Sequence, residues 1–298
     1  MTVVASGARV TLKNILYLTD FSEPSEAALP FAMAIAREYQ AKVYLLHVLS
    51  IVPIAQATPA EVMIEAREER AESEMQRLES QLAGLPHETS VERGPEVWPL
   101  VEGAIKEYGI DLIVLGTHGR TGYQKLLLGS TAEEIFRRSY VPVLTIGPWS
   151  RLPKAAKFQH LLFATDFTQE SLAAVPYAVS MAQENESRLI LLHVLTEPNN
   201  APAGQGAEES VANAISQLRG LIPTDAELWC RPEPVVRYGN PAEQILEAAI
   251  EHEADLIILG MRNVAGHLRA ATRLERTTAH KVVAHATCPV LTVCAGLK

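Results

Sequence analysis

The chain contains two copies of one sequence pattern, and this repeat constrains its fold more than any other feature. Residues 14–49 align without gaps on residues 160–195, with 16 identities in 36 positions. Two shorter matches follow in the same order: DLIVLG at 111–116 with DLIILG at 255–260, and VPVLTI at 141–146 with CPVLTV at 288–293. We therefore expect two copies of one domain rather than a single larger core.

The length of the chain agrees with this division. Its 298 residues are about twice the length of a common domain. The sequence PWSRLPKAAK near residues 148–158 carries two prolines and several charges, a composition typical of a linker. The predicted domains are residues 1–149 and 150–298.

Within each copy, short apolar runs alternate with longer amphipathic stretches, which predicts an α/β fold with a parallel sheet covered by helices on both faces. The five strands expected in the first copy lie at about 14–19, 42–49, 88–93, 111–116 and 141–146. Ser22 is placed to cap the first helix. Pro30 and Pro176 occupy matched helical positions and predict a kink or a late helix start.

The two copies differ in their middle segments. Residues 59–83 form a Glu/Arg-rich helical stretch, and we interpret its charged face as solvated. Residues 201–210, APAGQGAEES, favour a loop before a shorter helix.

Composition excludes several classes of function. The net charge is −9 and the sequence has no dense Lys/Arg run, so we expect no nucleic-acid partner. The apolar stretches are far shorter than the roughly 20 residues of a membrane helix, and the start of the chain does not resemble a leader peptide. Three cysteines without a C-x-x-C pair suit a reducing compartment, so a cytoplasmic protein is expected. His280 and His285 are five apart, so no metal site is predicted.

A glycine-rich loop follows the fourth expected strand of the first copy. It holds Gly116, Gly119 and Gly129, and the last of these precedes Ser130 and Thr131. Glycines let backbone amides approach oxygen atoms, and the start of a new helix at Gly129 presents amides and a positive dipole end to an anion. A phosphate ligand fits this loop. The residues leave a structural alternative open, because Ser130 with Glu133 also forms a capping box.

Asp20 follows the first expected strand, in the sequence TDFS. Its carboxylate could accept hydrogen bonds from ribose hydroxyls, or it could serve only to cap the next helix. The chain has neither a P-loop sequence nor a G-x-G-x-x-G sequence after this strand, which excludes two common kinds of nucleotide site.

These residues together resemble the universal stress protein family, in a tandem form. The signature G-x-x-G-x9-G-[ST] is met by Gly116, Gly119, Gly129 and Ser130, and each half of the chain covers a whole family domain. The resemblance implies an adenine-nucleotide alpha-hydrolase-like fold that binds ATP, with or without Mg. It further implies a role for each of the following residues: Asp20 and Gly116 hold the ribose, backbone near Val48 meets the adenine, Gly119, Gly129, Ser130 and Thr131 hold the phosphates, and Thr19 and His118 line the pocket.

The second copy departs from the signature. It keeps Thr165, Asp166 and Gly260, but Asn263 replaces the second glycine and no Gly-Ser pair opens its last helix. Its loop carries arginines that could hold an anion or form a solvated basic face, namely Arg262, Arg269, Arg273 and Arg276. We expect the second copy to bind ATP weakly or not at all.

The resulting hypothesis is an ATP-binding stress-response or regulatory protein that holds nucleotide in its N-terminal domain only. No catalytic residue is assigned. There are two alternatives. The first is a slow ATPase or phosphotransferase that uses the same pocket, and the second is a scaffold that binds no nucleotide. His47 and His193 occupy matched strand ends, where a shared structural role is expected. The family resemblance also implies an internal pseudo-dimer of the two domains, and whole chains could pair as a homodimer.

Overall fold

The computed structural model describes residues 9–51, 59–117, 128–150, 157–196, 205–224, 229–261 and 277–295. They form two compact units. Thr11–Pro148 make up the first unit, and Trp149–Lys298 together with the first ten residues make up the second unit.

The two units differ from the predicted domains, 1–149 and 150–298, in where they place the start of the chain. Arg9 and Val10 group with the second unit, because the Val10 N–H donates to Ser180 Oγ at 3.0 Å and Arg9 pairs with Glu184 at 3.3 Å. The first unit ends at Pro148, one residue before the predicted boundary.

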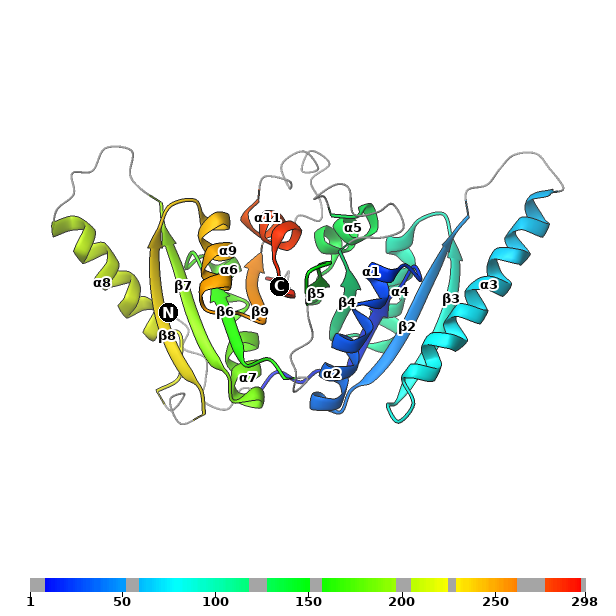
Figure 1. Ribbon diagram of the computed structural model, residues 1–298, viewed down its shortest axis with the longest axis horizontal. Coiled ribbons are helices and arrows are strands. Elements are labelled where there is room, and N and C mark those ends of the chain that lie inside the picture. Colours follow the sequence, from blue (N-terminus) through cyan, green and yellow to red (C-terminus); the bar gives the residue numbers. More distant parts are fainter. Residues whose placement is uncertain are drawn as a thin grey trace. The chain divides into compact units, whose positions relative to one another are not determined.

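The first unit is an α/β fold built on five parallel strands in the order β3-β2-β1-β4-β5 (Figure 1). Strands β1, β4 and β5 are buried along almost their whole length, as a sheet covered on both faces requires. Its elements are β1 Asn14–Leu18, α1 Glu23–Glu26, α2 Leu29–Tyr39, β2 Lys42–Ser50, α3 Pro59–Gln81, β3 His87–Gly94, α4 Val97–Tyr108, β4 Leu112–Gly116, α5 Ser130–Arg138 and β5 Val143–Ile146. The predicted fold class and the five expected strands are confirmed.

The second unit repeats this topology, with parallel strands in the order β8-β7-β6-β9-β10. Its elements are β6 His160–Ala164, α6 Gln169–Leu172, α7 Val175–Asn185, β7 Arg188–Leu195, α8 Gln205–Arg219, β8 Arg231–Tyr238, α9 Pro241–Glu251, β9 Leu256–Met261, α11 Thr278–His285 and β10 Val290–Cys294. In both units the strand order reverses next to the first strand, which is β1 in the first unit and β6 in the second. A crevice opens at such a point at the carboxyl ends of the strands.

The first helical segment of each unit is interrupted by proline. Ser22 caps α1 by accepting a hydrogen bond from the Ser25 N–H, as predicted, and α1 ends at Glu26. Helix α2 then begins at Leu29 with Pro30 in its first turn, where a missing N–H costs nothing. The late helix start predicted from the prolines is confirmed here and at Pro176 in α7.

The middle segments match the prediction in the first unit and differ in the second. Helix α3 covers most of the predicted stretch 59–83. Helix α8 begins at Gln205, inside the segment predicted as a loop, so the loop prediction is wrong for residues 205–210. Alanine and glutamate favour the first turns of a helix, and Glu208 complements its dipole. None of the helices in the described part of the chain is both long and apolar enough to cross a membrane.

Candidate functional site

The first unit has a pocket of about 240 Å³ where β1 and β4 end. These are the strands at which the strand order reverses. The described residues that line it come from the ends of β1, β2 and β4 and from the starts of α1, α4 and α5: Leu18, Thr19, Asp20, Ser25, Leu46, Val48, Val97, Leu115, Gly116, Thr117, Gly129, Ser130, Thr131 and Ala132. The pocket therefore has an apolar part near β2 and a part rich in hydroxyls and amides at the start of α5.

The turn after β1 is held in an unusual backbone conformation. Phe21 has φ of 61°, in the left-handed region that aromatic residues rarely adopt. Its ring lies 4.3 Å from the His47 ring, and its N–H donates to Thr19 Oγ1 at 3.0 Å. The buried His47 places Nδ1 2.8 Å from the Thr19 carbonyl oxygen. His47 thus fixes the turn that carries Asp20, which is the structural role expected for it.

Asp20 contributes to helix capping and also lines the pocket. Its Oδ1 accepts hydrogen bonds from the Ser22 N–H at 3.0 Å and from the Ser22 hydroxyl at 2.5 Å. A carboxylate has two oxygens with about four acceptor positions, so it can accept several hydrogen bonds at once. The two roles that the sequence left open are compatible.

Helix α5 begins at the pocket without a side-chain cap. Gly129 is the N-cap residue, with φ of −61° and ψ of 147°, and its N–H donates to the Thr117 carbonyl oxygen at 2.8 Å. The capping box proposed for Ser130 and Glu133 is wrong, because Ser130 is already the first helical residue. Within the described residues, neither the Ser130 nor the Thr131 side chain has a hydrogen-bond partner. The amides and hydroxyls of this turn are available to a ligand.

Gly116 has a packing role besides its place in the pocket. A Cβ atom at this position would lie 2.6 Å from the Pro24 carbonyl oxygen and 3.0 Å from Ser25 Cα. The glycine therefore lets α1 approach the end of β4. Gly260 plays the same part in the second unit, where the nearest backbone atom, the Glu170 carbonyl oxygen, would be 2.3 Å away.

The structure brings together seven of the nine residues predicted for the site: Thr19, Asp20, Val48, Gly116, Gly129, Ser130 and Thr131. The other two, His118 and Gly119, lie outside the described residues. Sequence reasoning missed the other seven lining residues, among them Ser25, Thr117 and Val97. Thr117 directly follows the glycine of β4, so its position was a usable signal, whereas Ser25 and Val97 reach the pocket through the packing of α1 and α4.

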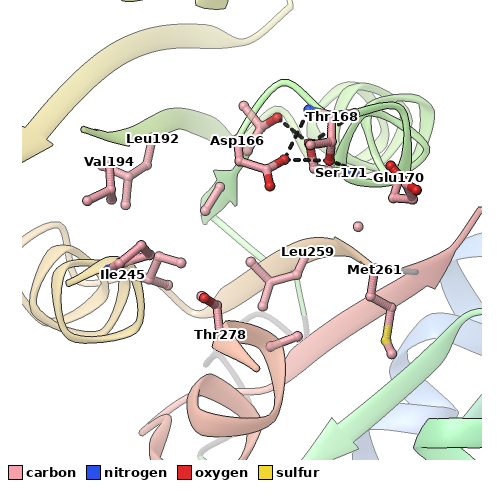
Figure 2. A pocket seen from close by; sticks show the side chains of 15 residues that line it. Asp166, Thr168, Glu170, Ser171, Leu192, Val194, Ile245, Leu259, Met261 and Thr278 are labelled. Atoms are coloured by element: carbon pink, nitrogen blue, oxygen red, sulfur yellow. Dashed lines mark hydrogen bonds between the residues drawn. The ribbon is translucent and has the colours of Figure 1, made fainter. Parts of the chain in front are cut away.

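The second unit has a matching pocket of about 330 Å³ (Figure 2). Its described lining residues are Ala164, Thr165, Asp166, Thr168, Glu170, Ser171, Leu192, Val194, Pro241, Ile245, Leu259, Gly260, Met261, Thr278 and Ala279. The turn after β6 repeats that after β1: Phe167 has φ of 62°, its ring lies 4.4 Å from His193, and His193 Nδ1 lies 2.8 Å from the Thr165 carbonyl oxygen. Burial disfavours the charge of Asp166, but hydrogen bonds from Thr168 and Ser171 outweigh it and lower its pKa.

The two pockets differ at the helix that closes them. In the second unit Thr277 is the N-cap of α11, and its hydroxyl accepts a hydrogen bond from the His280 N–H at 3.2 Å. The chain itself therefore uses one first-turn amide of α11, whereas the N-cap of α5 makes no side-chain bond of this kind. Arg262, Asn263, Arg269, Arg273 and Arg276 lie outside the described residues.

The three cysteines are buried, and burial keeps their thiols protonated. Burial raises the pKa of Cys230 and Cys294 to about 11 and that of Cys288 to about 12. Thiolates, the reactive form, are scarce at such values. The described residues contain no group of three or more His, Cys, Asp or Glu side chains that could hold a metal ion.

Comparison with known proteins identifies the family. The universal stress protein family model matches residues 11–147 and again 157–293. A universal stress protein of Mycolicibacterium smegmatis is 25% identical over 304 residues, covering 94% of this chain and 96% of its own. One from Methanocaldococcus jannaschii is 33% identical over 140 residues, covering 45% of this chain and 81% of its own. The crystal structure of a universal stress protein from Archaeoglobus fulgidus shares the fold, with a TM-score of 0.69 and 23% identity over 95% of this chain and 98% of that one. The chain belongs to the universal stress protein family, and it carries two family domains in tandem.

Proposed function

We propose that this protein binds ATP, with or without Mg, in the pocket of the first unit, and that nucleotide occupancy serves a regulatory role in a stress response. The observation that carries the proposal is the uncapped start of α5 at the carboxyl ends of β1 and β4. Unpaired first-turn amides and the positive end of a helix dipole attract phosphate.

The remaining lining residues fit the other parts of an adenine nucleotide. Asp20 and Gly116 both line this pocket, and the Asp20 carboxylate would accept hydrogen bonds from the ribose hydroxyls. Leu46 and Val48 from β2 supply an apolar surface for the adenine, with backbone near Val48 to meet its edge. Gly129, Ser130 and Thr131 would hold the phosphates, together with Gly119, while Thr19 and His118 would complete the lining.

The described lining supports binding rather than catalysis. Asp20 is the one ionisable side chain among the described residues of this pocket, and its Oδ1 is engaged by Ser22. A phosphotransfer site needs groups that position a water or acceptor and neutralise charge. We therefore propose a non-catalytic nucleotide-binding protein.

Calorimetry with ATP tests this proposal. We expect about one ATP per chain, and Asp20→Ala should weaken ATP binding about 10-fold to 100-fold, because hydrogen bonds to a charged group contribute about 1.5–3 kcal/mol. Asp166→Ala is the matched control, since Asp166 Oδ1 accepts a hydrogen bond from the Thr168 N–H as Asp20 Oδ1 does from the Ser22 N–H. It should cost similar stability and leave ATP affinity within about twofold. Two ATP per chain, or equal losses in both variants, would contradict binding in the first unit only.

His47 gives a second test, because it acts on the site without lining it. His47→Ala removes a buried ring that supports Phe21 and the Thr19 carbonyl oxygen, so the turn carrying Asp20 should relax. We expect ATP affinity to fall about 5-fold to 10-fold and the free energy of unfolding to fall by about 2 kcal/mol.

The matched variant His193→Ala separates the two effects. It should lower the free energy of unfolding, measured by urea denaturation, by a similar amount and leave ATP affinity unchanged. If both histidine variants lowered ATP affinity equally, the loss would reflect general instability and not the position of Asp20.

A further inference from the structure

We propose that the groove between β3 and α4 in the first unit binds a linear aliphatic diamine, a molecule with an ammonium group at each end of an apolar stem. The groove holds a cavity of about 180 Å³ between the edge strand of this unit's sheet and the helix that follows it (Figure 1). Among the described residues, it shares only Leu46 with the lining of the ATP pocket. The proposal therefore goes beyond ATP binding and does not depend on it.

The floor of the groove is apolar and aromatic. Leu16 from β1 and Leu46 from β2 are buried beneath it. The rings of Tyr44 and Tyr108 line it and stack with their centroids 4.5 Å apart. On the side of α4 the groove is open at Gly103, where no atom lies within 4 Å of an added Cβ. Such a surface can cover a methylene chain, and tyrosine rings also attract cations.

The rim of the groove carries an excess of negative charge. Glu88, Glu92 and Glu107 line it, and all three are exposed. Lys42 pairs with the first of them: its Nζ lies 2.7 Å from Glu88 Oε2 and 4.5 Å from the centroid of the Tyr44 ring. None of the ion pairs among the described residues involves Glu92 or Glu107. Three carboxylates against one ammonium group leave two negative charges, which a dication would neutralise.

The carboxylates suit separated charges and not a metal ion. Partial burial raises the pKa of Tyr108, and the negative charges of Glu107, Glu88 and Glu92 raise it further, so all three act on the groove. The described residues nevertheless contain no group of such side chains that could hold a metal ion. Helix α4 joins two parallel strands and runs antiparallel to β3, so Glu107 and Glu92 reach the groove from the far end of the helix and the far end of the strand.

The second unit carries its own cation at the corresponding positions. Strand pairing makes Arg237 of β8 the counterpart of Glu92, and the alignment of α9 with α4 makes Glu251 the counterpart of Glu107. The Arg237 guanidinium pairs with the Glu251 carboxylate, and only 16% of the Arg237 side chain is exposed. A cation on an apolar stem therefore bridges strand and helix in the second unit.

A diamine would reproduce this bridge in the first unit. One ammonium group would pair with Glu107 as the guanidinium does with its counterpart, and the other would pair with Glu92, which stands where the arginine stem begins. The Ser90 hydroxyl donates to Glu92 Oε1 at 2.6 Å and orients this carboxylate. The pair between Lys42 and Glu88 shows that an ammonium group is stable at this rim.

Calorimetry with putrescine at fixed ionic strength tests the proposal on the full chain. We expect one putrescine per chain, and about 5-fold weaker binding of butylamine, which has the same stem and one charge. Glu92→Gln and Glu107→Gln should each weaken putrescine binding about 5-fold. Glu102→Gln is the matched control, because Glu102 lies on the same helix and pairs with Lys106 outside the groove. It should leave putrescine binding within about twofold.

Glu92→Arg gives the first unit the residue that the second unit has. The new guanidinium should pair with Glu107, as Arg237 does with Glu251, and its stem should fill the groove. Putrescine binding should be lost, while urea denaturation shows a stability equal to or above that of the wild type. A stable Glu92→Arg variant that binds putrescine normally would overturn the proposal.

The remaining outcomes are equally distinct. Wild-type protein that binds no putrescine overturns the proposal, as does displacement of putrescine by MgCl₂ at equal ionic strength, which would indicate a metal site. If the control Glu102→Gln weakens binding as much as Glu92→Gln, general attraction to an acidic chain holds the amine and the groove does not. Asp20→Ala should leave putrescine binding unchanged, so a failure of ATP binding and a failure of diamine binding are observed separately.

Discussion

Gly260→Ala should lower the free energy of unfolding by about 3 kcal/mol, because of all the glycines with described surroundings it has the closest backbone contact with an added Cβ atom. The added Cβ would lie 2.3 Å from the Glu170 carbonyl oxygen, 2.4 Å from the Ser171 carbonyl oxygen and 2.6 Å from Ser171 Cα. All three are backbone atoms, which cannot rotate away as a side chain can. Relief requires α6 to move away from β9, and that movement disturbs the packing of both.

Gly116→Ala should lower the free energy of unfolding by a smaller amount, about 2 kcal/mol, because the nearest backbone atom would lie 2.6 Å from the added Cβ. It should also weaken ATP binding, since α1 carries Ser25 into the pocket. Gly103→Ala is the control. Gly103 lies inside α4 and has no atom within 4 Å of an added Cβ, so this variant should raise the free energy of unfolding by about 1 kcal/mol. Urea denaturation measures all three. A neutral Gly260→Ala would show that α6 does not need its close approach to β9.

These glycines show what the sequence could predict and what it could not. Gly116 was interpreted as a ligand-binding residue, and it lines the pocket. The contact with Pro24 depends on how α1 lies over β4, a long-range arrangement that no local pattern reveals. The same holds for His47, whose role follows from its contacts with Thr19 and Phe21, 28 and 26 positions earlier in the chain.

The fold was more accessible to prediction than the site. Alternating apolar runs repeated in two copies predict the strands, because a parallel sheet buried on both faces needs continuous apolar segments. The strand β4, expected at 111–116, lies at Leu112–Gly116. The early start of α8 was missed because the prediction gave more weight to glycine and proline near residue 204 than to the helix-forming residues that follow them.

Gly129→Thr should abolish most ATP binding at almost no cost in stability. The N-cap residue Gly129 has φ of −61° and ψ of 147°, and Thr277, the N-cap of α11, has φ of −74° and ψ of 147°. Threonine therefore fits the backbone of the first unit, and threonine and glycine are similar as N-caps, so the free energy of unfolding should change by less than about 0.5 kcal/mol. The new hydroxyl should accept a hydrogen bond from the Ala132 N–H, as Thr277 does from His280.

The loss of that donor, with a branched side chain beside the phosphates, should weaken ATP binding about 100-fold by calorimetry. Thr277→Gly is the reciprocal control: it alters the cap of α11 by the same chemistry and should leave ATP affinity in the first unit unchanged. A Gly129→Thr variant that is stable and still binds ATP normally would mean that the start of α5 does not hold phosphate. Because stability and affinity are expected to separate here, this substitution distinguishes a ligand-binding helix terminus from one that only completes the fold.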